Sequence, residues 1–268
     1  MGLITWFDPS RPRSVAVAAV LVGLLAGLLA ALFLEAAGEP SIQEAINIER
    51  ARAAAAAQEH ADAAAGHASP AEPEIVSRSV QRGAGLFAAY AITGAAFGLL
   101  VAVAFWVMRG SRPDPFRRAL VSGAILAGAI TVAPWLKYPP NPPAVGDPDT
   151  LAKRQILYVS VICLAAVLGA VAAALSTRLG QDGWPAHRRT MAVVAVVVLP
   201  LAAAFSLLPP PPDAITVPAN LLWRFRLASL SGNLLLWGVL TLGFGALMAE
   251  ARLRRESTGD QSVSTRSP

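Results

Sequence analysis

The sequence predicts an all-α membrane protein with six transmembrane helices, and its composition and apolar runs carry that prediction. Of the 268 residues, 55% are hydrophobic and only 15% are charged, whereas an average soluble protein has about 25% charged residues. Six runs with few charges are each close to the ~20 residues that a helix needs to cross a bilayer. Helix is the expected structure there, because lipid offers no partner to an unpaired peptide group.

The first span, at about 14–34, follows Arg11 and Arg13. This basic flank leaves open the alternative of a cleaved signal peptide. A retained helix is favoured, because the apolar run of about 20 residues exceeds the usual 7–15 residues of a signal peptide. No small-x-small cleavage site follows the run. The five later spans lie at about 84–107, 116–136, 155–175, 190–208 and 227–248.

Two of the spans carry a GxxxG spacing, which lets helix backbones approach closely. Gly23 and Gly27 form one pair, and Gly94 and Gly98 form the other. We expect these glycines to pack the bundle internally, and a face of a homo-oligomer is the alternative.

The basic residues predict the orientation of the spans. With both termini cytoplasmic, the inner segments hold 13 Lys and Arg in 58 residues, and the outer segments hold 9 in 85. Cytoplasmic loops of membrane proteins carry this excess. The net charge of +5 is scattered beside apolar runs, so it indicates membrane topology and not nucleic-acid binding. Residues 1–256 are expected to form one membrane domain, and 257–268 a disordered tail.

The first outer loop, 35–83, differs in composition from the rest of the chain. Ser41 and Glu44 form a capping box, so a helix is predicted to start there, and the alanine-rich segment that follows favours helix. Eight of the 17 acidic residues lie in this loop. An acidic loop raises the local concentration of cations, so we predict a long acidic helical appendage outside the membrane.

Candidate metal ligands gather in this loop. Glu59, His60 and Asp62 lie within four residues, and His67 follows seven residues after His60. Imidazole with carboxylate suits a borderline divalent ion such as Co²⁺, Ni²⁺ or Zn²⁺. The alternative is a solvated alanine-rich helix with incidental histidines, since Gly66 weakens the helix before His67.

The other two outer loops resemble each other at an offset of 70 residues. At this offset, prolines of segment 139–158 align with prolines of segment 209–228, and Arg154 aligns with Arg224. Each arginine lies where a helix is expected to begin. A duplicated helical hairpin is one explanation, because internal repeats are common in transporters; chance is the other. The two arginines either reach lipid headgroups or line a vestibule, where a cationic ring would oppose metal entry.

The span centres after the first helix contain no Asp or Glu. This argues against a self-contained proton-driven transporter, which usually needs a carboxylate inside the membrane. Asn233 and Ser231 are the polar residues that we single out for a transport path, although a buried amide also serves to bind helices together. The sequence carries no HExxH, Walker A motif or paired catalytic carboxylates, so we expect no enzyme.

Three stretches carry a resemblance to a known family: the histidine-containing acidic loop, PPNPPAVGDPDTLAKRQ before the fourth span, and VPANLLWRFRLASLSGNLLLW (Val217–Trp237). In these stretches the chain resembles the CbtA family of predicted cobalt transporter subunits. The resemblance implies a bacterial inner-membrane protein in contact with lipid that takes up Co²⁺ for cobalamin synthesis, with no permanently bound cofactor. It also implies a small histidine-bearing membrane partner, CbtB. A non-transporting scaffold or assembly factor, and a permease for another small solute, are the alternatives.

Overall fold

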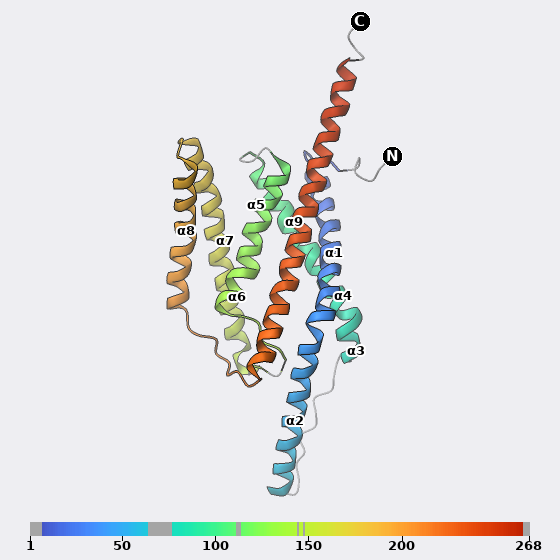
Figure 1. Cartoon of the computed structure of the whole chain (residues 1–268), viewed down its shortest axis with the longest axis vertical. Helices are drawn as coiled ribbons and strands as arrows, with labels where there is room; N and C mark the ends of the chain where they lie inside the picture. Colours follow the sequence, from blue (N-terminus) through green and yellow to red (C-terminus); the bar gives the residue numbers. More distant parts are fainter. Residues whose placement is uncertain (1–6, 64–76, 111–113, 144, 147, 265–268) are drawn as a thin grey trace.

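The computed structural model describes residues 7–63, 77–110, 114–143, 145–146 and 148–264, and these contain helices and loops without a β-strand. Within this part of the chain, six helical stretches are long and apolar enough to cross a membrane. The predicted fold class is confirmed: the protein is all-helical with six membrane spans (Figure 1).

The spans are built from α-helices that shorter turns extend or join. Segment Gln81–Gly85 leads from α3 into α4 through a kink at Gly83, whose backbone is not helical. Segment Gly128–Val132 is π-helical and joins α5 to α6. Short 3-10 turns at Met108–Gly110 and Pro148–Thr150 stand beside α4 and α7. The α-helices are α1 (Pro12–Ala37), α2 (Glu39–Ala63), α3 (Arg78–Val80), α4 (Leu86–Val107), α5 (Pro115–Ala127), α6 (Ala133–Lys137), α7 (Leu151–Gln181), α8 (Ala186–Leu207) and α9 (Ala219–Ser264).

Helices α1 and α4 meet through the two GxxxG pairs. A Cβ atom at Gly23 would collide with the carbonyl oxygen of Gly94, and one at Gly98 would collide with the carbonyl oxygen of Ala19. Only hydrogen at these positions permits such an approach of two backbones. The expectation that the glycines pack the bundle internally is therefore confirmed.

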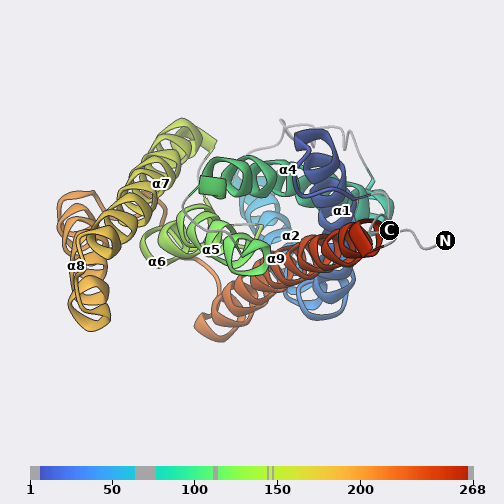
Figure 2. The same ribbon diagram turned by 90° about the horizontal axis from the view of Figure 1, so that it is seen from above.

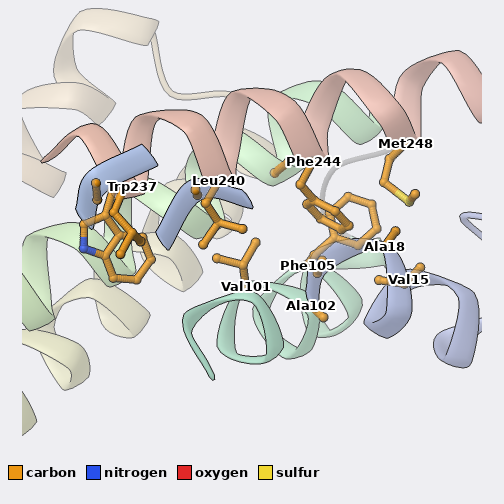
Figure 3. Close-up of a cluster of buried hydrophobic side chains, with 14 residues drawn as sticks. Val15, Ala18, Val101, Ala102, Phe105, Trp237, Leu240, Phe244 and Met248 are labelled. Carbon is orange, nitrogen blue, oxygen red and sulfur yellow. The ribbon is translucent and has the colours of Figure 1, made fainter. Parts of the chain in front are cut away.

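The main core lies between α1, α4, α5 and α9 (Figure 3). Phe105 of α4 meets the ring of Phe244 of α9 edge to face, with centroids 5.1 Å apart. Val101, Leu240 and Met248 are fully buried around this pair. Small side chains of α1, such as Ala18, fill the remaining space, so the four helices form one packed unit.

Helices α7 and α8 form a peripheral pair beside this unit (Figure 2). None of the residues of α8 is buried, and its main contact is with α7. Large apolar side chains such as Val194 and Leu199 are exposed. Lipid accommodates such a surface at no cost, which agrees with a helix that crosses the bilayer.

The start of α1 lies beside the part of α9 near Arg255 at one end of the bundle. The carboxylate of Asp8 is 2.6 Å from the guanidinium of Arg255 and 3.1 Å from that of Arg11. Helix α9 continues to Ser264, beyond the boundary at residue 256 that the sequence predicts. The opposite end, which we call the loop end, carries α2 and the two proline-rich loops (Figure 1).

Candidate functional site

The two proline-rich loops meet at the loop end and border an open cavity that we call the vestibule. This cavity of about 310 Å³ is lined by residues that include Tyr138, Arg154, Tyr158 and Asp213. The hydroxyl of Tyr138 donates to the carbonyl of Pro209 over 2.9 Å. Burial raises the pKa of Tyr138 above its ordinary value, so this hydroxyl stays protonated as a donor at neutral pH. The loops that resemble each other in sequence thus face each other across one cavity.

The arginines that open α7 and α9 are both paired with carboxylates. Arg154 lies 3.3 Å from Asp213, whose side chain is only 2% exposed. Thr150 donates a further hydrogen bond of 2.6 Å to the same carboxylate. Arg224 lies 2.6 Å from Glu44 of α2. Arg154 thus lines the vestibule with its charge offset by Asp213, whereas Arg224 does not line this cavity.

Helix α2 is anchored at its root over the loop end. Ala45 and Ile48 pack with Val217 and Leu221 in a second apolar cluster, and Arg52 donates to the carbonyl of Thr216. From there the helix projects away from the bundle (Figure 1).

The predicted metal ligands lie at the far end of α2 or beyond it. Glu59, His60 and Asp62 are within its helical backbone, but their side chains lie outside the described part of the structure. His67 lies outside the described residues altogether. Among the residues that the structure does describe, no group of three or more His, Cys, Asp or Glu could hold a metal ion. The metal cluster in this loop therefore stays a prediction.

A second, smaller cavity of about 140 Å³ lies between α4, the α5–α6 span, α7 and α9, and we call it the chamber. Its polar lining comes from Thr131, Tyr158, Ser229 and Asn233. The Asn233 amide nitrogen donates to the carbonyl of Ser229 over 2.8 Å. The amide is thus held on its own helix, α9, and lines the chamber. Ser231, in contrast, is exposed and lines neither cavity.

One side of the chamber is fixed by Trp237. Its indole nitrogen donates to the hydroxyl of Thr131 over 2.9 Å. The ring of Phe97 stacks on the indole, with centroids 4.6 Å apart. Because both Thr131 and the indole are buried, this hydrogen bond sets the orientation of a chamber hydroxyl.

Thr131 lies in the π-helical segment Gly128–Val132. π-helical turns inside α-helices are frequent at functional sites. The local cause is Pro134, which has no N–H to donate to the carbonyl of Ile130, another chamber residue. This proline in the third span was the available sequence signal for a special site. Without the fold, it does not reveal that Thr131 faces Asn233 across one cavity.

Comparison with known proteins identifies one family. A family model described as "Probable cobalt transporter subunit (CbtA)" matches residues 13–249. No curated protein and no solved structure matches the chain. The matched region begins in α1 and ends in α9, so it includes the six spans, the vestibule and the chamber.

Proposed function

Because the chain belongs to the CbtA family of probable cobalt transporter subunits, we propose that it is a membrane subunit of a cobalt-uptake transporter that serves cobalamin synthesis. The observation that carries this proposal is the polar chamber, which lies beside a vestibule in an otherwise apolar bundle of spans. Its role is translocation without catalysis, and its place is the inner membrane of a bacterium with both termini in the cytoplasm.

The chemistry of the two cavities suits a divalent cation that must not bind tightly. In the vestibule, the carboxylate of Asp213 offsets the charge of Arg154. In the chamber, Thr131, Ser229 and Asn233 offer hydroxyl and amide oxygens. Oxygen ligands without charge bind a divalent ion weakly, and a site that conducts must also release its ion.

The appendage and a partner supply the stronger ligands in this proposal. Glu59, His60, Asp62 and His67 collect Co²⁺ outside the membrane, where the acidic loop attracts cations. The family name describes a subunit, and a small histidine-bearing membrane protein of the CbtB kind is the partner that we propose.

Cellular uptake of ⁵⁷Co tests the function and the path together. We expect the wild-type chain, produced together with the proposed CbtB-like partner, to support uptake, and Asn233→Ala to lower the initial rate severalfold. Ser231→Ala is the matched control, because Ser231 lies two residues away on α9 but lines neither cavity. No uptake by the wild type would refute the function. Equal uptake by Asn233→Ala would refute the path.

The same assay tests the appendage through a His60→Ala/His67→Ala double variant. We expect a lower uptake rate at nanomolar cobalt and recovery at higher concentration, because capture and not translocation is impaired. Uptake unchanged at every concentration would exclude the loop from the mechanism.

The absence of Asp and Glu from the centres of the later spans favours a second candidate, a membrane scaffold or assembly factor. A scaffold would co-purify with its partner yet add no cobalt flux to liposomes that contain the partner. Competition of uptake by unrelated solutes would instead indicate a permease with another substrate.

A further inference from the structure

The vestibule and the chamber share a wall. Pro140 and Tyr158 are the residues that border both cavities. Pro140 comes from the loop after α6, and Tyr158 from the second turn of α7. These two residues therefore stand where the vestibule and the chamber adjoin.

Arg226 of α9 holds the loop side of this wall. Its Nε donates to the carbonyl of Pro140 over 3.2 Å, and a terminal nitrogen donates to the Asn141 side chain over 2.9 Å. The carbonyl of Arg226 in turn accepts a 3.3 Å hydrogen bond from the indole of Trp135. A charged guanidinium that donates hydrogen bonds to two successive residues restrains the position of the loop strongly and specifically.

The start of the same loop is attached elsewhere. Lys137 donates to the carbonyls of Phe205 and Leu208 over 2.7 and 2.9 Å, and Tyr138 donates to Pro209. These bonds run to the end of α8 and not to α9. Release of Arg226 would thus free Pro140 from α9 while the base of the loop stays anchored.

We propose that Pro140 and Tyr158 form the gate between vestibule and chamber, and that Arg226 is the positioning residue that latches it shut. In the latched state the chamber is shielded from the vestibule. When the hydrogen bonds from Arg226 to Pro140 and Asn141 break, the chamber opens to the vestibule. The cargo of the gate rests on the proposed function, whereas the latch rests on these contacts alone.

Cysteine accessibility tests the latch without any metal. Cys163 is the single cysteine of the chain, so Cys163→Ser gives a cysteine-free background. In it, Ser229→Cys places a thiol in the chamber wall. A membrane-impermeant methanethiosulfonate reagent is then added to intact cells or sealed vesicles. We expect Arg226→Ala to raise the labelling rate at position 229 at least tenfold.

Arg224→Ala is the matched control. Arg224 lies two residues away on the same helix and loses the same charge, but it pairs with Glu44 of α2. We expect it to leave the labelling rate within twofold. Arg226→Lys, which can keep one of the two hydrogen bonds, should label at an intermediate rate and also serves if Arg226→Ala fails to fold.

Three outcomes would overturn the latch. One is equal labelling in the wild-type and Arg226 backgrounds, and another is equal acceleration by Arg224→Ala. The third is a matching rise at Ser231→Cys, which lies outside both cavities and would reveal general loosening. A wild type that labels as expected but carries no cobalt would refute the proposed function and leave the latch intact.

Discussion

At the scale of single residues, the structure explains how a few polar side chains are kept in order inside an apolar bundle. Trp237 and Thr131 are both buried and satisfy each other. The Asn233 amide nitrogen donates to the carbonyl of Ser229 within α9. Each of these groups would cost free energy if left unpaired in an apolar surrounding. Their pairing therefore both stabilises the bundle and fixes the lining of the chamber.

Substitution of Trp237 by Phe tests this pairing. The phenyl ring keeps the stack on Phe97 but removes the donor to Thr131. We expect destabilisation, and a double-mutant cycle with Thr131→Val should give a coupling of about 1 kcal/mol. Thermal unfolding in detergent measures it. A coupling near zero would show that the hydrogen bond contributes nothing.

A second residue-scale prediction concerns the pH dependence of the contact between Asp8 and Arg255. Burial alone would raise the pKa of Asp8, but hydrogen bonds from Ser10 and the charges of Arg255 and Arg11 outweigh it, so the pKa lies below its ordinary value. The contact is thus fully stabilising above the unfolded-state pKa of about 3.9. It is lost as the pH falls through the lower folded-state pKa.

Unfolding temperatures of wild type and Asp8→Asn should therefore differ at pH 7 and converge in acid below the ordinary pKa. A difference that persists unchanged at low pH would contradict the ionic origin of the contact. Arg254→Gln is a suitable control, because Arg254 pairs with Glu250 on its own helix.

At the scale of elements, the sequence predicted the spans well because each apolar run was long and had charged or proline-rich ends. The capping box at Ser41 predicted a helix in the first loop, and α2 begins two residues earlier, at Glu39. The π-helical turn at Gly128–Val132 was not predicted, since its apolar composition does not distinguish it from an α-helix. Only the fold shows that this turn carries Thr131 into the chamber.

The contact between α1 and α4 gives the element-scale prediction. Gly94→Ala inserts a methyl group against the carbonyl of Gly23, so we expect destabilisation of about 1–3 kcal/mol from overpacking. Gly238→Ala in α9 is the control, because nothing lies near a Cβ there. Replacing a helical glycine that has open space around it with alanine should raise the free energy of unfolding by about 0.5–1 kcal/mol. If both variants unfold at the same temperature, α1 and α4 do not approach each other as closely as described.

At the scale of the whole molecule, the sequence identified the two proline-rich loops but not their contact. Their likeness suggested equivalent positions in a repeat, and the repeat stays a prediction. What the fold adds is that Thr150 and Arg154 of one loop region reach Asp213 of the other. Such a pairing depends on how α7, α8 and α9 assemble, and local composition carries no information about that assembly.

The orientation of the molecule is testable with fluorescent fusions. Green fluorescent protein folds in the bacterial cytoplasm but not after Sec-dependent export. We expect a fusion after residue 268 to fluoresce, and a fusion inserted between residues 66 and 67 to stay dark. The opposite pattern would place the acidic loop inside and contradict the direction of uptake.

The central claim is that Co²⁺ crosses the membrane through the chamber beside Asn233. Its most direct test is flux into sealed proteoliposomes that hold a dye quenched by Co²⁺ and the subunit purified with its membrane partner. We expect rapid quenching with wild type, quenching slowed severalfold with Asn233→Ala, and a wild-type rate with Ser231→Ala. If Co²⁺ quenches the dye in wild-type vesicles no faster than in protein-free vesicles, Co²⁺ does not cross through the chamber.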